Sequence, residues 1–524
     1  MSVTNYNKFL YRQEALIPSD FLQIREALNI VSDAVSINFL TLRYILLFIF
    51  IILTFILTFL IKKIKIKYSI RIIPIIALPI IVYYYVFSPN CLVNKMIPTH
   101  ISENVVSVYY QKGFILGFFN EIPNMILKEP ANYTATNVKK IYDNINIDNN
   151  SHLNDKNSKP NIIVILSEAF TDPLRLEGVK YSIDPLISIR KYMDEFGYLN
   201  MISPQVSGGT ANVEYEVLTG VNTSLFHDSA IVYQQYINNE HFSIAHYLNS
   251  KGYVCLGIHP YYDWFWRRNK VYPHLGFNNF YSMETMNNTE KVGRFISDLS
   301  LSKEIIEKYE ENKVVPLFIK GISMQNHVPY NLNRYNDDTK IVSIESDNLS
   351  SGLKKELTEY VNGLYYASEA LDYLIEYFKK VEEPTYIIMY GDHGTYFVDY
   401  VDEYFSLLGH QPGAQTDHLL SQTPVIFWTN QKKEKIETDY IGASFLGKEI
   451  LKYVGIELPN YFKVLDELHK RVKVLNRNYM IDSNNNFFYR GTYSNELNSL
   501  INNINLIGYD INFGKNYLEY NYSD

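Results

Sequence analysis

The alternation of apolar and polar positions separates a membrane-like stretch near the start of the chain from a globular remainder. An uncharged and almost wholly apolar run extends from Tyr44 to Ile61, and a shorter one extends from Ile72 to Phe87. A helix needs about 20 consecutive apolar residues to cross a bilayer core, so the first run is long enough and the second is marginal. The pattern therefore predicts two transmembrane helices within residues 39–88.

The loop between these two runs contains basic residues and no acidic one: Lys62, Lys63, Lys65, Lys67 and Arg71. Basic loops stay on the cytoplasmic side of a membrane, so both ends of the chain are expected outside the cytoplasm. A buried core hairpin is the alternative, but so basic a loop beside a long apolar run fits it badly. Residues 1–38 lack the layout of a cleaved signal peptide and are expected to form a surface segment.

From Pro160 the pattern changes to short apolar runs, typical of strands, that alternate with helical stretches. Strands are predicted at Asn161–Leu166, Tyr253–Ile258, Leu317–Ile322, Thr385–Tyr390 and Pro424–Trp428. Helices are predicted at Phe242–Ser250, Leu353–Lys380 and Ala443–Val454. This alternation indicates an α/β domain, residues 160–475, whose mostly parallel sheet is flanked by helices.

The segments on either side of this domain have less pattern. Residues 89–159 are expected to form a juxtamembrane connector, with a helical piece around Val106–Phe119, followed by an Asn-rich linker. Residues 476–524 are rich in Asn and Tyr and are treated as a C-terminal extension. The length of 524 residues fits two or three domains, or one large α/β domain with accessory parts.

The net charge and the cysteine content exclude two classes of protein. The formal net charge is -8, and no sustained basic patch is present, which excludes a typical nucleic-acid-binding protein. The two cysteines are Cys91, beside the membrane segment, and Cys255, inside an apolar run. Both are expected to be free thiols, so the chain is not a disulfide scaffold.

Polar side chains follow two of the predicted strands directly and open one predicted helix. Glu168 comes after the first strand, and Asp392-His393 come after the fourth strand and a single glycine. Thr210 begins a helix-like stretch behind Ser207-Gly208-Gly209. Open α/β sheets bind ligands outside the carboxyl ends of their strands, so these side chains are expected to meet there.

The chemistry of this set is that of a metal-activated alcohol. Oxygen and imidazole ligands around one hydroxyl suit Mn²⁺ or Zn²⁺, and Mg²⁺ is less natural because of the histidine. A threonine at a helix N-terminus also faces the positive end of the helix dipole. Taken singly, each residue has an ordinary alternative: Thr210 as a helix cap, Gly391-Asp392-His393-Gly394 as a turn, and Glu168 as a helix-start acid.

Further candidates lie after other strands. His327, in Asn326-His327-Val328-Pro329-Tyr330, and His259 each follow a predicted strand and could act as acid, base or phosphate ligand. The aromatic run Tyr261–Arg268 offers the Arg268 guanidinium for a phosphate and the Trp266 ring for a glycerol unit. The alternatives are structural histidines and a membrane-proximal aromatic patch.

In this order, the motifs resemble those of the lipoteichoic acid synthases and phosphoglycerol transferases, a sulfatase-like family of the alkaline phosphatase superfamily. The likeness runs from about residue 160 to 470. The matching residues are Ser167-Glu168-Ala169-Phe170, Gly209-Thr210 with Glu214-Tyr215, Phe265-Trp266-Arg267-Arg268-Asn269, Asn326-His327-Val328-Pro329-Tyr330 and Gly391-Asp392-His393-Gly394.

The resemblance implies an alkaline-phosphatase-like α/β fold and a role for each matching residue. Thr210 would be the nucleophile, and Glu168, Thr210, Asp392 and His393 would hold a divalent metal, typically Mn²⁺. Trp266, Arg268, His327 and His259 would line the glycerophosphate pocket. Two features depart from the family: Ala211 stands where a serine is frequent, and two membrane helices are predicted where many relatives have five.

These features together predict a membrane-anchored, extracytoplasmic transferase of the cell envelope. It would move glycerophosphate from phosphatidylglycerol to a glycolipid, teichoic-acid-like polymer or glycan, with a covalent Thr210 intermediate, His327 as acid and base, and Arg268 on the phosphate. A phosphoethanolamine transferase and a metal-dependent phosphodiesterase or sulfatase-type hydrolase are the enzymatic alternatives. Thr210-Ala211-Asn212 does not match the sequence around a sulfatase's modified Cys or Ser. A catalytically silent scaffold is the non-enzymatic alternative.

Overall fold

The structure, a computed structural model, describes residues 16–23, 52–53, 109, 113–114, 117–119, 121–145, 159–331, 333–411 and 415–522. The chain divides into two compact units, one formed mainly by the chain up to Ile126 and the other by the chain from Leu127 onward. In the first unit, Tyr109 donates a hydrogen bond of 2.6 Å to the Leu16 carbonyl, and Phe118 packs nearby.

The predicted membrane runs fall almost wholly outside the described residues. Only Ile52 and Leu53 of the first run are described, and both are helical and exposed. In the part of the chain that the structure does describe, no helix is both long enough and apolar enough to cross a membrane. The two transmembrane helices therefore stay a prediction.

The second unit is built on a sheet of eight strands in the order β10-β2-β9-β8-β1-β7-β3-β4. β9 pairs antiparallel with both β8 and β2, and the other pairings of this sheet are parallel. The strands are β1 (Asn161–Ser167), β2 (Tyr198–Ile202), β3 (Val254–His259), β4 (Asn279–Ser282), β7 (Leu317–Ile322), β8 (Thr385–Gly391), β9 (Gln422–Thr429) and β10 (Tyr440–Gly442). The α/β class and the mostly parallel sheet are confirmed.

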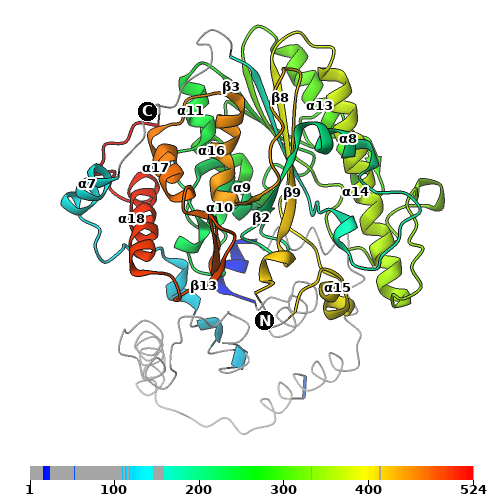
Figure 1. The fold of residues 1–524 in the computed structure, drawn as a ribbon, viewed down its shortest axis with the longest axis horizontal. Coiled ribbons are helices and arrows are strands. Elements are labelled where there is room, and N and C mark those ends of the chain that lie inside the picture. Colours follow the sequence, from blue (N-terminus) through cyan, green and yellow to red (C-terminus); the bar gives the residue numbers. More distant parts are fainter. Residues whose placement is uncertain are drawn as a thin grey trace. The chain divides into compact units, whose positions relative to one another are not determined.

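Helices cover both faces of this sheet (Figure 1). One face carries α8 (Ile187–Phe196), α13 (Asp298–Glu311) and α14 (Ser351–Phe378). The other carries α9 (Thr210–Thr219), α11 (Ile244–Ser250), α16 (Ala443–Val454) and α17 (Asn460–His469). Because helices shield both faces, the central strands β1, β7 and β8 are buried at every residue, which explains why apolar residues dominate them.

The remaining elements are short or peripheral. A three-stranded antiparallel sheet contains β11 (Val472–Leu475), β12 (Tyr479–Asp482) and β13 (Phe487–Tyr489), and β5 (Lys291–Val292) pairs with β6 (Phe295–Ile296). Besides short 3-10 helices, the structure also contains the α-helices α7 (Ala135–Asn144), α10 (Val232–Gln235), α12 (Arg268–His274), α15 (Val401–Leu407) and α18 (Asn495–Asn512).

The linker and the C-terminal extension contain packed helices that the pattern did not define. α18 packs against α17 and α7. Asp510 of α18 is buried and accepts a hydrogen bond of 2.5 Å from Tyr133, just before α7, and others from the backbone of Tyr517 and Leu518. This carboxylate therefore ties residues 133–144 to the end of the chain.

Candidate active site

Two carboxylates meet because β1 and β8 are neighbouring parallel strands. Ser167 pairs with Gly391, so Glu168 and Asp392 leave the sheet side by side. The Ala169 backbone N–H donates to Asp392 Oδ1 at 2.8 Å, which fixes that carboxylate. Only glycine fits at position 391, because a Cβ there would lie 1.9 Å from the carbonyl oxygen of Phe170.

Thr210 is presented to the same point by the start of α9. Gly209 precedes the helix with φ of 67°, a left-handed conformation that favours glycine, and a Cβ there would meet the Gln205 side chain at 2.9 Å. Thr210 is 5% exposed, and its Oγ1 lies 3.5 Å from His393 Nε2. The hydroxyl therefore lies at the positive end of a helix dipole, beside the histidine.

His393 is oriented so that one ring nitrogen faces the carboxylates. Its Nδ1 is 2.6 Å from the Gly394 carbonyl, which can only accept, so Nδ1 carries a proton and Nε2 is the ring nitrogen that faces the carboxylates. Nε2 lies 3.1 Å from Asp392 Oδ2 and 3.7 Å from Glu168 Oε1. One ligand atom from each of the three side chains lies within 4.8 Å of the others, the arrangement of a metal centre.

The charge of this cluster calls for a cation. Burial raises the pKa of Glu168 well above its ordinary value, and the neighbouring Asp392 carboxylate raises it further. Asp392 is fully buried, and its Oδ2 accepts no hydrogen bond from any described residue. Two buried carboxylates, an imidazole and a hydroxyl fit a divalent ion of the Mn²⁺ or Zn²⁺ type.

Arg268 lies in a buried ion pair and interacts electrostatically with Glu168. Its Nε and Nη2 donate to Glu214 Oε2 at 3.1 and 2.9 Å, and the two side chains are 1% and 0% exposed. The hydroxyls of Tyr272 and Tyr233 donate to Glu214 Oε1 at 2.6 and 3.0 Å. The Nη1 of Arg268 is buried with no hydrogen-bond partner among the described residues, so one donor is left for an anion.

Strained backbone surrounds the site. Ala169, Trp266 and Arg267 have φ of 49°, 55° and 55°, values that non-glycine residues rarely adopt. Ala169 adjoins Glu168, and the other two residues precede Arg268 at the start of α12. Such strain persists where the surrounding contacts over-determine it, as they do at functional sites.

Two further histidines, His259 and His327, lie near Arg268. His259, at the end of β3, is buried, and its Nδ1 contacts the Ile322 carbonyl at 3.1 Å. Burial lowers its pKa well below the ordinary value, and the Arg268 guanidinium lowers it further. Its Nε2 has no hydrogen-bond partner within the described chain. His259 is therefore neutral and keeps one ring nitrogen for a ligand.

His327 lies nearer the surface, on an aromatic wall. Its ring centroid is 5.9 Å from that of Phe295 and 6.4 Å from that of Phe265. Phe265 also packs against His259 at 6.1 Å and against Trp266 at 5.5 Å. The structure thus brings His259, His327 and Arg268 together, and it connects Trp266 to them through Phe265.

Three buried charged residues near the site were not assigned a role from the sequence. Glu214 lies one helical turn after Thr210, a spacing that places both on one face of α9. Lys320 interrupts the apolar strand β7, and burial lowers its pKa to about 7 while its Nζ lies 2.9 Å from the Tyr390 hydroxyl. Arg334 follows the histidine loop and left no signal in the sequence pattern.

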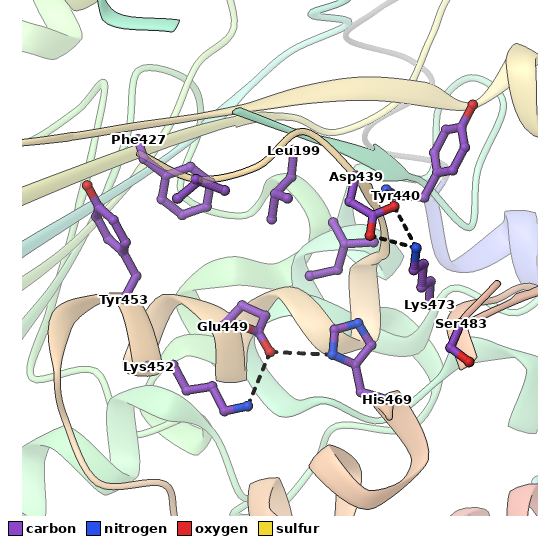
Figure 2. Close-up of a pocket in the computed structure, with 12 residues that line it drawn as sticks. Leu199, Phe427, Asp439, Tyr440, Glu449, Lys452, Tyr453, His469, Lys473 and Ser483 are labelled. Atoms are coloured by element: carbon purple, nitrogen blue, oxygen red, sulfur yellow. Dashed lines mark hydrogen bonds and ion pairs between the residues drawn. The ribbon is translucent and has the colours of Figure 1, made fainter. Parts of the chain in front are cut away.

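A second group of two acids and a histidine lies on α16 and α17, and Figure 2 shows Glu449 and His469 of this group. Glu449, Asp466 and His469 also have ligand atoms within 4.8 Å of one another, and Glu449 and His469 line a cavity of about 420 Å³. Lys448 Nζ lies 2.9 Å from Asp466 and 2.8 Å from His469 Nδ1, and Lys452 Nζ lies 2.5 Å from Asp466. The lysine ammonium groups thus lie where a metal ion would otherwise bind. These acids and the histidine therefore form an ion-pair network.

Comparison with known proteins agrees with this geometry. The sulfatase family model matches residues 160–456, more than half of the chain. A putative cyclic beta-1,2-glucan modification protein of Rhizobium meliloti is 32% identical over 417 residues, 78% of this chain and 63% of that protein. Lipoteichoic acid synthase of Staphylococcus aureus is 28% identical over 279 residues, 50% of this chain and 41% of that protein. The chain thus spans less than two thirds of either relative.

Solved structures share the fold. A phosphoglycerol transferase of Streptococcus pyogenes, in complex with sn-glycerol-1-phosphate, superposes with a TM-score of 0.62 and 24% identity, covering 75% of this chain and 97% of that one. A lipoteichoic acid synthase of Listeria monocytogenes gives a TM-score of 0.51 and 17% identity, covering 74% and 98%.

An α/β sheet with this cluster at the carboxyl ends of its strands defines the alkaline phosphatase class of enzymes. Within that class, the chain belongs to the sulfatase family.

Proposed function

We propose that the chain is a membrane-anchored, extracytoplasmic phosphoglycerol transferase that acts through Thr210. The observation that carries this proposal is the convergence of a buried hydroxyl, three metal-type ligands and one unpaired guanidinium donor. A hydroxyl held in this way is an activated nucleophile, and the guanidinium suits a phosphate oxygen.

The residues fit a divalent ion held by Glu168, Thr210, Asp392 and His393, with Mn²⁺ favoured and Mg²⁺ or Zn²⁺ as alternatives. Bound there, the ion would lower the pKa of the threonine hydroxyl and neutralise charge on the phosphate. Without an ion, burial and the neighbouring Asp392 carboxylate disfavour the ionised form of Glu168.

In the first half of the reaction, Thr210 Oγ1 attacks the phosphorus of phosphatidylglycerol after giving up its proton to solvent. A Thr210–phosphorus bond forms as the bond between phosphorus and the diacylglycerol oxygen breaks. His327 donates a proton to that oxygen, so diacylglycerol leaves as a neutral alcohol. Nη1 of Arg268 holds a phosphate oxygen, and Glu214 keeps the guanidinium in place.

In the second half, the acceptor hydroxyl attacks the same phosphorus and gives its proton back to His327. The Thr210–phosphorus bond breaks, and the threonine oxygen regains a proton from solvent. His259, neutral and buried beside Arg268, would bind the glycerol or phosphate through Nε2, and Trp266 would complete that wall. Both protons and the glycerophosphate group are therefore accounted for over one cycle.

The substrates are inferred from the relatives. The Rhizobium relative is named for glucan modification, the Staphylococcus relative for lipoteichoic acid synthesis, and the Streptococcus structure holds sn-glycerol-1-phosphate. These names support phosphatidylglycerol as the lipid donor and a glycolipid, teichoic-acid-like polymer or glycan as the acceptor.

The test follows the covalent intermediate. The full chain in phosphatidylglycerol nanodiscs with Mn²⁺ is analysed by intact mass spectrometry and peptide mapping, and diacylglycerol is measured in parallel. A glycerophosphate adduct on Thr210 is expected, absent from Thr210→Ala and present in Thr219→Ala, which changes the same residue type at the far end of α9. Normal diacylglycerol release by Thr210→Ala would overturn the scheme. An adduct formed only from phosphatidylethanolamine would show that this lipid, and not phosphatidylglycerol, is the donor.

A further inference from the structure

We infer that Arg334 is a positioning residue, which holds the loop of residues 325–329 so that His327 faces the reacting phosphate. The inference rests on the proposed function, because it assigns His327 the proton transfers. Arg334 itself is 7% exposed and contacts the loop rather than a substrate.

The guanidinium of Arg334 lies among the carbonyl groups of this loop. Nη1 donates to the Gln325 carbonyl at 3.1 Å, and Nη2 donates to the Pro329 carbonyl at 3.2 Å and to the carbonyl of His327 itself. Nη1 also lies 3.4 Å from Asn326 Oδ1. One side chain thus satisfies three backbone acceptors on both sides of the histidine, in a loop that has no strand or helix of its own.

The same guanidinium braces the aromatic wall beside the histidine ring. Its Cζ lies 4.8 Å from the Tyr330 ring centroid and 6.0 Å from that of Phe295. Phe295 packs against the His327 ring at 5.9 Å, and the Tyr330 hydroxyl donates to the Asn326 carbonyl at 2.8 Å. Arg334 therefore fixes the backbone that carries His327 and one of the rings that limit its rotation.

The loop gains rigidity because Arg334 is itself anchored to the long helix α14. Glu359 of α14 is 1% exposed, and its Oε2 accepts the backbone N–H groups of Arg334 and Tyr335, each at 3.0 Å. A catalytic side chain on a loop acquires precision when its supports lie on a rigid element. Here the path runs from α14 through Glu359 and Arg334 to His327.

A lysine cannot reproduce this arrangement. The planar guanidinium presents donors in a fixed fork to several carbonyls at once, whereas an ammonium is a compact charge on a flexible stem. Arg334→Lys keeps the charge near the site and loses the fork. It therefore separates positioning of the loop from a general electrostatic effect on the phosphate.

The experiment is a double-mutant cycle on the full chain in nanodiscs with Mn²⁺. Wild type, Arg334→Lys, His327→Gln and the double variant are compared for the Kd of sn-glycerol-1-phosphate by calorimetry and for kcat and KM of diacylglycerol release. Arg477→Lys is the matched control, because Arg477 also donates to two backbone carbonyls, of Thr223 and Phe226, beyond the C-terminal end of α9.

Arg334→Lys is expected to lower kcat by about 10- to 100-fold in the wild-type background and to have little effect in the His327→Gln background. The plot of kcat against pH is expected to lose the branch that reports His327, and to lose it in Arg334→Lys as in His327→Gln. Equal losses in both backgrounds, or an equal loss in Arg477→Lys, would overturn the inference. If the two substitutions have non-additive effects on the Kd of sn-glycerol-1-phosphate but no diacylglycerol is released, the inference about Arg334 stands. Phosphatidylglycerol is then excluded as the donor.

Discussion

The molecule contains two groups of two carboxylates and one histidine that differ in what balances their charge. Around Asp392, the carboxylates are buried, and among the described residues no lysine or arginine forms an ion pair with them. Around Asp466, Lys448 and Lys452 lie within 2.9 Å of the carboxylate. Side chains of the same types can hold a metal ion in one place and form an ion-pair network in the other, and the difference is the lysine charge beside the second group.

The pKa shifts of the two groups run in opposite directions. Burial and the neighbouring Asp392 raise the pKa of Glu168. Burial would also raise that of Glu449, but His469, Lys448 and Lys452 outweigh it and hold the pKa of Glu449 below its ordinary value. A carboxylate without a partner resists ionisation, and a paired one favours it.

The largest expected effect is on metal binding. Asp392→Asn removes a buried anionic ligand, so bound Mn²⁺, measured by atomic emission after desalting, should fall below about 0.1 equivalent, and activity should fall at least about 10³-fold. Asp466→Asn is the control and should leave both quantities unchanged. Loss of metal in Asp466→Asn would place the ion in the other group.

Removal of the metal by a chelator should change the thermal stability through the Asp392 group and not through the Asp466 group. An ion at 100 times its Kd stabilises the folded state by about 2.7 kcal/mol, so EDTA should lower Tm by several degrees and Mn²⁺ should restore it. The Asp392→Asn variant should show no such response, whereas Asp466→Asn should respond as the wild type does. An unchanged wild-type Tm across this titration would argue against a bound metal.

Removal of Lys448 tests the ion-pair network. Its side chain is 0% exposed, and Lys448→Met leaves Asp466 with Lys452 alone, which should lower the free energy of unfolding by about 1–3 kcal/mol in urea titrations. Because the positive charge is gone, Zn²⁺ should raise the Tm of this variant more than that of the wild type. No difference between the two zinc responses would mean that charge balance does not decide where a metal binds.

The smallest effect concerns pH. In metal-free protein, the folded state holds a proton on Glu168 that the unfolded state loses above the ordinary pKa, so stability should fall as pH rises through the raised pKa. Glu449 should act oppositely, with its stabilisation lost as pH falls below the ordinary value. Between pH 2 and 9, urea unfolding of metal-free Glu168→Gln should lose the fall in stability above the ordinary carboxyl pKa. Urea unfolding of metal-free Glu449→Gln should lose the fall in stability below that pKa. Identical slopes in both variants would contradict the assigned directions.

The buried strands and the long helices were readable from local pattern. The bounds predicted for β7 and α16 match the structure, and those of β1, β3, β8, β9, α11 and α14 differ by one or two residues. The short strands β10, at the edge of the sheet, and β2, beside it, were missed because they carry few residues and are partly exposed. Beyond residue 475, helix α18 was missed because packing against α17 stabilises it.

The sequence by itself determined the class of fold and the meeting of Glu168 with Asp392, because parallel strands that end in polar residues share one edge. It also determined that Thr210 opens a helix, because the two glycines before it permit the turn. Only the tertiary structure decided that Glu214 fixes Arg268, that Arg334 holds the His327 loop and that lysines fill the second acidic group. These contacts join residues far apart in the chain, and buried charge is balanced by whatever the fold brings near it, which no local pattern records.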